Sequence, residues 1–209
     1  MGVYKKIMVL AVLSCLYGGL SGQVKTERPH YVGGYWGVSL PSSGNFMKGA
    51  SWTAPAAEYT FQVVPWFAFG GYVGYVSGQE KGITSDRYEG DAVSGYTDRQ
   101  MSSFRCGIPF YFSYSSGNRR FEPYIRLAGG AVNTDYKIAG DQINRSEVRK
   151  WSVFADAGVG CRYFLNKERR WGIDLRCTQK WNQASWELMD IGNDNRFELS
   201  LGILLKISR

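Results

Sequence analysis

Apolar and polar residues alternate along most of the chain, and the pattern is clearest near its C-terminal end. From Phe197 to Ile207 every second residue is apolar, and the residues between them are mostly small or charged. A period of two residues predicts a β-strand whose two faces meet different surroundings. Either the apolar face packs on a protein core with water outside, or it contacts lipid around a polar interior.

The same period predicts eight strands. They cover residues 30–40, 51–62, 66–78, 101–115, 122–138, 150–165, 171–187 and 196–208. Short connections alternate with longer ones that are polar and rich in Gly, Asp and Asn; the longer ones cover 41–50, 79–100, 139–149 and 188–195. An even number of strands, with short turns at one end and long loops at the other, is typical of an up-and-down transmembrane β-barrel.

The face opposite the apolar one carries ionised side chains, which decides between the two surroundings. The residues expected there are Glu58, Arg105, Arg126, Asp156, Arg162, Asp174, Arg176, Lys180, Glu198 and Lys206. An Arg or Lys exposed to lipid near the midplane costs about 2–4 kcal/mol, whereas acids and bases can pair inside a closed barrel. We therefore predict an all-β fold: an eight-stranded antiparallel transmembrane barrel with an ion network in its lumen. The segment 66–78 does not reveal its own orientation, because aromatic residues occupy both of its faces.

Composition and charge add little to this picture. The chain is 15% aromatic and contains 26 glycines, which favours strands. Its net charge is +7, and a positive excess of this kind often indicates a nucleic-acid partner. Here, however, the basic residues are scattered, apart from "NRR" and "NKERR", which we expect in tight turns. We predict a solvated or headgroup-facing rim and no nucleic-acid partner.

Residues 1–22 have the pattern of a signal peptide. Two lysines precede an apolar run over 7–16, and small residues follow before Gln23. A second interpretation is a lipoprotein signal in which Cys15 carries the lipid. Either signal takes the chain out of the cytoplasm, and we expect residues 23–209 to form the barrel domain. The three remaining cysteines lack CxxC spacing, so they predict neither a disulfide framework nor a zinc site.

Several stretches carry a resemblance to a known family: "YVGGYWGVSL", "VPWFAFGGYVGY", "FEPYIRLAGGAV" and the alternating last strand. Over residues 23–209 the chain resembles the small eight-stranded outer-membrane β-barrels of Gram-negative bacteria, the OmpA/OmpX-like porin family. The resemblance implies an outer-membrane protein of the cell envelope with both termini in the periplasm. It implies membrane lipid, lipopolysaccharide and the outer-membrane assembly machinery as partners. The role would be structural, or surface interaction, or conduction through a narrow pore.

Candidate catalytic chemistry is sparse. The single histidine, His30, is expected near the periplasmic rim, and Ser39 lies a strand-length away from it. A nucleophile and its base must lie within hydrogen-bonding reach of one another. We therefore predict no enzyme, no catalytic residue and no cofactor. Two alternatives remain open: a secreted soluble lipocalin-like barrel that binds a small apolar ligand and, more distantly, a lipid-modifying enzyme of the outer membrane.

The predicted loop over 79–100 is the candidate surface for an extracellular ligand. It contains four acidic residues but lacks the D-x-D-x-D-G pattern of a calcium loop. We therefore expect a solvated loop and no metal site. Tyr88 and Tyr96 are the residues on it that would contact a ligand first.

Overall fold

The computed structural model describes residues 28–41, 49–88, 91–114, 120–140, 143–166, 168–182 and 194–207. The predicted signal peptide, Cys15 and the N-terminal boundary of the barrel domain lie outside these ranges. The described segments contain no helix with the length and hydropathy that a membrane crossing needs.

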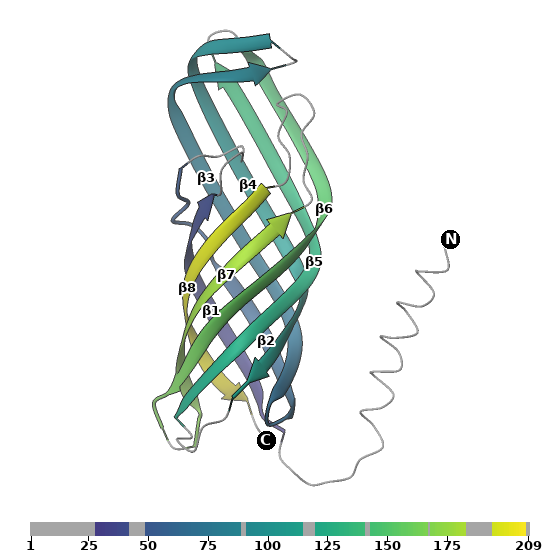
Figure 1. Ribbon diagram of the computed structural model, residues 1–209, viewed down its shortest axis with the longest axis vertical. Coiled ribbons are helices and arrows are strands. Elements are labelled where there is room, and N and C mark those ends of the chain that lie inside the picture. The colour runs from purple at the N-terminus through teal and green to yellow at the C-terminus, as the bar shows by residue number, and fades with distance from the viewer. Residues whose placement is uncertain are drawn as a thin grey trace, which may run out of the picture.

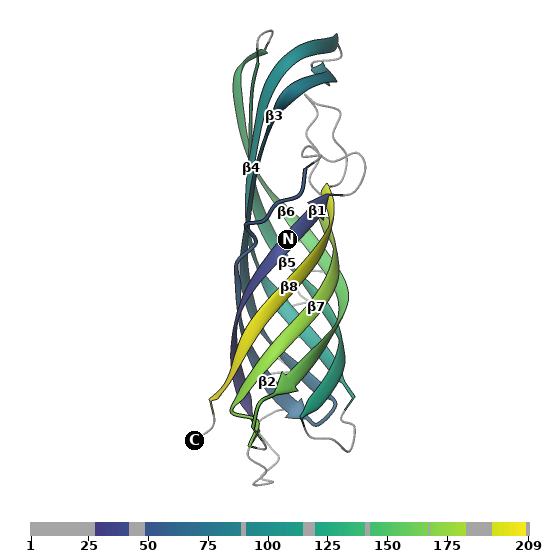
Figure 2. The same cartoon turned by 90° about the vertical axis from the view of Figure 1, so that its left-hand side faces the viewer.

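In the described residues, eight strands form a closed antiparallel barrel (Figure 1). They are β1 (His30–Pro41), β2 (Ala56–Val64), β3 (Phe67–Tyr88), β4 (Asp91–Ser113), β5 (Phe121–Gly140), β6 (Ile143–Phe164), β7 (Trp171–Asn182) and β8 (Asp194–Ile207). Each strand pairs with the next in sequence, and β8 pairs with β1. The predicted fold class is confirmed. β1 begins and β8 ends at the end of the barrel that carries the short turns (Figures 1 and 2).

Two stretches that we predicted as long loops are strand instead. The β3–β4 ladder continues from Gln79↔Gln100 to Tyr88↔Asp91, so it runs through the predicted loop 79–100. The β5–β6 ladder likewise reaches Gly140↔Ile143, within the predicted loop 139–149. Figure 2 shows these strands rising above the others, with the upper ends of β3 and β4 bent to one side. The period was missed because the outward residues of this part of the sheet, such as Gln79 and Lys81, are polar or charged and not apolar.

The second strand starts later than predicted, at Ala56 and not at residue 51. Upstream of it, isolated bridges join Ser51 to Ser39 and Thr53 to Ser77. Pro55 interrupts this stretch, and proline cannot donate a hydrogen bond to a ladder. The predicted strand and loop boundaries that fall within residues 42–48 and 183–193 lie outside the described part of the chain.

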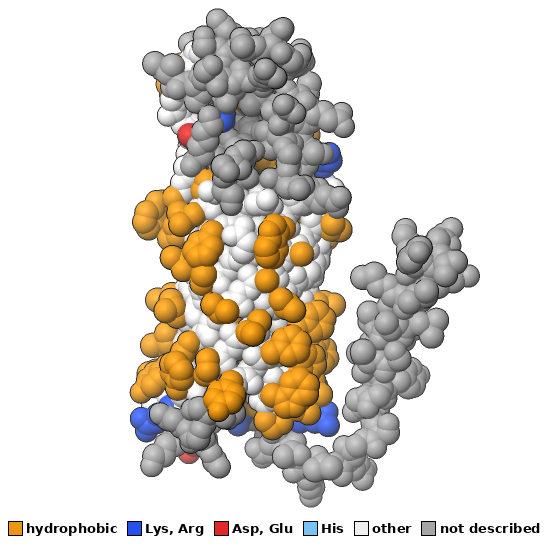
Figure 3. All heavy atoms as spheres, viewed as in Figure 1, with side chains coloured by type: hydrophobic (Ala, Val, Ile, Leu, Met, Phe, Trp, Pro, Cys, Tyr) orange, Lys and Arg blue, Asp and Glu red, His pale blue; other side chains and the backbone are white. Residues whose placement is uncertain are grey.

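The outward side chains form an apolar belt around the barrel. Leu201, Ile203 and Val159 are 57%, 63% and 59% exposed, as expected of side chains that face lipid. Figure 3 shows the belt as hydrophobic side chains over the lower and middle wall, with Lys and Arg below them. Exposed aromatic residues also lie at both ends of the strands: Trp66, Tyr114 and Trp171 at the short turns, and Trp52 and Trp181 at the opposite end.

The belt orients β3, which the sequence left open. Tyr72 and Val76 are buried inside the barrel, whereas Val73 and Tyr75 are exposed on its outer face. The even residues of β3 therefore point inward.

Inside the barrel, glycines make room for tyrosine rings. A Cβ atom at Gly202 would collide with the ring of Tyr35, which lies opposite it on β1. A Cβ atom at Gly160 would likewise collide with the ring of Tyr124. Because glycine has no side chain, the neighbouring ring can lie flat across the strand at each of these two positions.

We predict that Gly202→Leu lowers the free energy of unfolding by about 1–3 kcal/mol, the usual cost of overpacking. The leucine must displace the Tyr35 ring, which is buried and hydrogen-bonded. Gly34→Leu is the control, because a Cβ atom at Gly34 meets nothing within 4 Å. Urea unfolding in lipid vesicles, followed by tryptophan fluorescence, compares the two variants. Equal effects would contradict the proposed packing.

Candidate functional site

The interior of the barrel holds a cluster of ion pairs centred on Glu58. Arg176 Nη1 lies 2.7 Å from Glu58 Oε1, and Arg126 Nη2 lies 3.0 Å from the same oxygen. Tyr111 donates a hydrogen bond to the other carboxylate oxygen, and Arg126 also pairs with Asp156. All five side chains are almost fully buried. Two arginines thus share one carboxylate in a space that excludes water, where each charge needs its partner.

A second cluster lies around Arg162 and Asp174. Arg162 Nε is 3.6 Å from Asp174 Oδ2, and Arg162 Nη1 is 3.2 Å from Glu122 Oε1. Tyr124 and Tyr35 donate hydrogen bonds of 2.6 Å and 3.1 Å to the two oxygens of Asp174. The carboxylate is therefore held by one guanidinium and two phenols.

The tyrosines also stack against the arginines. The guanidinium carbon of Arg176 lies 3.5 Å from the ring centroid of Tyr35. That of Arg162 lies 4.5 Å from the ring of Tyr111 and 4.8 Å from that of Tyr124. Such cation–π contacts compensate part of the hydration that a buried guanidinium loses.

Toward the end of the barrel opposite the short turns, the interior contains Lys180, Glu198 and Arg105. Lys180 Nζ lies 2.6 Å from Glu198 Oε2 and 3.3 Å from the hydroxyl of Tyr72. Arg105 is fully buried, and its guanidinium nitrogens make no hydrogen bond to the described residues. An electrostatic interaction with Glu198, and not a hydrogen bond, links the Arg105 side chain to its charged neighbours.

The structure brings most of the predicted lumen residues together, with one exception. Nine of the ten are buried inside the barrel: Glu58, Arg105, Arg126, Asp156, Arg162, Asp174, Arg176, Lys180 and Glu198. Lys206 is only partly buried, near the end of β8, and makes no ion pair with the described residues. Its place at the rim keeps it within reach of water.

Sequence reasoning missed several interior charges, namely Glu122, Arg99, Arg196 and Arg169. The alternation of inward and outward residues along each strand would have revealed Glu122, Arg99 and Arg196. Glu122 has the parity of Arg126 in β5, Arg99 that of Arg105 in β4, and Arg196 that of Glu198 in β8. They were overlooked because they lay at or beyond the predicted strand ends.

Arg169 gave no such signal, because it comes from a turn. Its φ of 57° lies in the left-handed region. From there it pairs with Glu122 and places its guanidinium carbon 4.1 Å from the ring centroid of Phe164.

No catalytic constellation appears among the described residues. His30 contacts the hydroxyl of Tyr59 at the end of the barrel that carries the short turns. Ser39 is buried near the other end of β1, so the two do not form a nucleophile–base pair. The described part of the chain also holds no group of three His, Cys, Asp or Glu residues that could bind a metal.

The three cysteines of the barrel, Cys106, Cys161 and Cys177, are free. They alternate with exposed apolar residues on the outer face, such as Phe104 and Ile108 around Cys106. They therefore lie in the apolar belt.

The strands above the belt carry polar and charged side chains on their outer face. Lys81 Nζ lies 3.3 Å from Asp98 Oδ2, and Gln79 donates to the same carboxylate. Burial raises the pKa of Asp98, but the hydrogen bonds from Gln79 and Lys81 outweigh it and hold the pKa below its usual value. Tyr96 is 46% exposed here, whereas the side chain of Tyr88 lies outside the described part.

The arrangement does not fit the soluble lipocalin-like alternative. A barrel that binds an apolar ligand needs an apolar interior and a polar exterior. Here the ionised residues fill the interior, and the apolar residues cover the outside. An apolar exterior of this kind is suited to contact with lipid.

Comparison with known proteins gives a likeness of fold. No protein-family model matches the chain, and no curated protein matches it by sequence. Among solved structures, Ail, the attachment invasion locus protein of Yersinia pestis, was determined in complex with the heparin analogue sucrose octasulfate. It is 14% identical, with a TM-score of 0.54 over 87% of this chain and 100% of Ail.

Two further solved structures are similar. Neisserial surface protein A (NspA) is 12% identical, with a TM-score of 0.55 over 87% of this chain and 98% of NspA. The outer membrane protein OprG from Pseudomonas aeruginosa is 11% identical, with a TM-score of 0.51 over 88% of this chain and 98% of OprG. At such identities the likeness shows a shared fold. Together with the apolar belt and the ionised interior, the likeness shows that the chain has the fold of the small eight-stranded outer-membrane β-barrels.

Proposed function

We propose that the protein is a plugged barrel with a structural and surface-interaction role, and that it is not an enzyme. One observation carries the proposal: ion pairs cross the lumen between strands that are not neighbours. Glu58 on β2 is bound by Arg126 on β5 and Arg176 on β7. Side chains from opposite walls thus meet inside the barrel. An eight-stranded barrel is only wide enough for its own side chains, so this layer leaves no room for a water-filled channel.

The orientation follows from the plan of such barrels. Short turns face the periplasm and longer connections face outward. We therefore place both termini in the periplasm and the tall β3–β6 strands outside the cell. Membrane lipid and lipopolysaccharide would surround the belt, and the outer-membrane assembly machinery would insert the chain.

The tall strands offer the surface for an extracellular partner. Ail, which shares the fold, is an attachment protein and was solved with a sulfated sugar analogue. By analogy we infer contact with an extracellular ligand through this region, with Tyr96 as the first residue to substitute. Tyr88 is the second residue to substitute.

A second candidate, narrow-pore conduction, is favoured by Arg105. Its guanidinium nitrogens make no hydrogen bond to the described residues, so less energy opposes its movement than opposes that of Arg126 or Arg176.

Conductance in planar bilayers tests the two candidates. We expect the wild-type protein to show no steady single-channel steps, because the ion pairs close the lumen. Arg176→Ala removes one of those pairs and should give small steps, whereas Arg170→Ala, whose side chain is exposed in a turn, should give none. Steady wild-type steps that Arg105→Ala or Arg176→Ala enlarge would contradict the plugged barrel and favour the narrow pore.

A further inference from the structure

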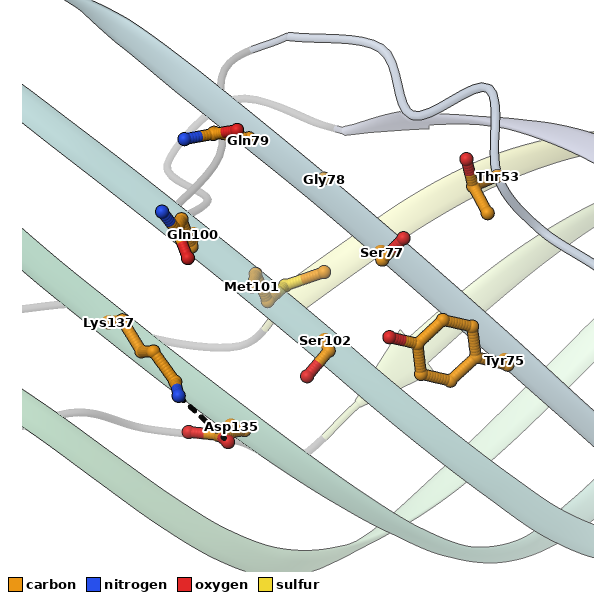
Figure 4. A pocket seen from close by; sticks show the side chains of 10 residues that line it. All are labelled: Thr53, Tyr75, Ser77, Gly78, Gln79, Gln100, Met101, Ser102, Asp135 and Lys137. Atoms are coloured by element: carbon orange, nitrogen blue, oxygen red, sulfur yellow. Dashed lines mark ion pairs between the residues drawn. The ribbon is translucent and has the colours of Figure 1, made fainter.

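A pocket of about 480 Å³ lies on the outer face of β3, β4 and β5, away from the ionic interior. Its lining includes Tyr75, Ser77, Gln79, Gln100, Ser102 and Asp135. Figure 4 shows Tyr75 at one end of the pocket and Asp135, paired with Lys137, at another. Thr53 approaches from the segment before β2, because it bridges to Ser77.

The pocket begins where the apolar belt ends. Along the β3–β4 ladder, the outward pair Tyr75↔Phe104 is exposed and aromatic. The next outward pairs, Ser77↔Ser102 and Gln79↔Gln100, are polar. On the neighbouring β5, the outward residues change in the same way, from Leu127 to Asp135. In the proposed orientation, this level is that of the outer-leaflet headgroups.

The charges around the pocket are balanced. Asp135 Oδ2 lies 3.3 Å from Arg149 Nη2 and 3.9 Å from Lys137 Nζ, and Lys137 in turn lies 3.0 Å from Glu147. Two acids and two bases leave no net charge to attract a phosphate or sulfate group.

The remaining lining suits a neutral polyol. Two amides and two serine hydroxyls can donate and accept hydrogen bonds, and Tyr75 offers a ring face. Asp135 Oδ1 is buried and accepts no hydrogen bond from the described residues. A ligand hydroxyl would reach this oxygen only after the Asp135 side chain turns toward the pocket, because the oxygen has almost no accessible surface.

We propose that this pocket binds a sugar residue of an outer-leaflet glycolipid headgroup. A lipid-anchored sugar would reach the pocket from below, with its acyl chains beside Tyr75 and Phe104 and its hydroxyls against Gln100 and Asp135. The proposal rests on the outer-membrane role proposed above and names the site at which that membrane would contact the barrel specifically.

Photo-cross-linking tests it. The full-length protein, with a benzophenone amino acid in place of Ser77, is reconstituted into phosphatidylcholine–phosphatidylglycerol vesicles that contain rough lipopolysaccharide. We expect a cross-link to lipopolysaccharide that falls at least fivefold with Gln100→Ala combined with Asp135→Asn. Gln179→Ala is the matched control, because Gln179 lies on the outer face of β7, away from the pocket, and should leave the yield unchanged.

Competition identifies the chemistry and its source. Core oligosaccharide without lipid should reduce the cross-link at millimolar concentration, whereas inorganic phosphate should not. A yield insensitive to the double substitution, or competition by phosphate alone, would overturn the proposal. Cross-linking of the free oligosaccharide as efficient as that of lipopolysaccharide would overturn the lipid source.

The same gels separate this inference from the proposed function. A barrel that migrates faster before heating than after it, and fractionates with the vesicles, is folded and inserted. If it then fails to cross-link, only the pocket assignment is wrong. Recovery of the protein as a soluble species would instead overturn the outer-membrane role.

Discussion

Glu58→Ala is expected to lower the free energy of unfolding by about 3–5 kcal/mol, the usual cost of removing one partner of a buried ion pair. The substitution takes away the carboxylate that Arg176 and Arg126 share. Asp156 still pairs with Arg126, but the structure describes no other carboxylate within ion-pair distance of Arg176. Urea titration in lipid vesicles, followed by tryptophan fluorescence, measures the loss.

Glu168→Ala is the control for this prediction. Glu168 pairs with Arg170 at an N–O distance of 2.8 Å, which is close to the distance between Arg176 and Glu58. The side chains of Glu168 and Arg170, however, are both about two-thirds exposed. Exposed pairs contribute about 0–1 kcal/mol. A difference between the two variants would therefore reflect burial and not pairing as such. If both variants lost the same amount, the interior would be hydrated and the plugged barrel would be wrong.

Leu201→Arg is expected to destabilise the protein by about 2–4 kcal/mol, because it places a charge on the lipid-facing wall. Leu201 is exposed in the middle of the alternating last strand, with Leu199 and Ile203 on the same face. Its effect should appear in the same urea titration and as a lower yield of the heat-modifiable form.

Tyr96→Arg serves as the comparison for Leu201. Tyr96 is also exposed on the outer face, but it lies on β4 above the belt, where charged residues such as Asp98 already occur. A surface substitution there should change stability by less than about 0.5 kcal/mol. A similar loss in both variants would mean that the belt does not face lipid.

The sequence was most informative where lipid and ions face each other across one strand. In β8, an alternation of apolar residues with Glu198, Ser200 and Gly202 follows directly from a wall with hydrocarbon on one side. The same reasoning brought Glu58, Arg126 and Arg176 onto one face without any structure. It could not tell which of them pair, because partners such as Glu58 and Arg176 come from strands that are not neighbours.

The sequence was least informative where the environment is the same on both sides. Above the belt the residues Gln79, Glu80 and Lys81 form regular strand, but water outside removes the apolar signal. The role of the interior tyrosines was also hidden. Only the closed barrel shows that the hydroxyls of Tyr35 and Tyr124 bind Asp174.

The placement of the three free cysteines has a consequence for passage through an oxidising compartment. A thiol must ionise before it attacks an oxidant or a disulfide, and hydrocarbon opposes that ionisation. Once the barrel is inserted, Cys106, Cys161 and Cys177 face acyl chains and are shielded from periplasmic redox enzymes. These three thiols can then persist in the free form without cross-linking one copy of the protein to another.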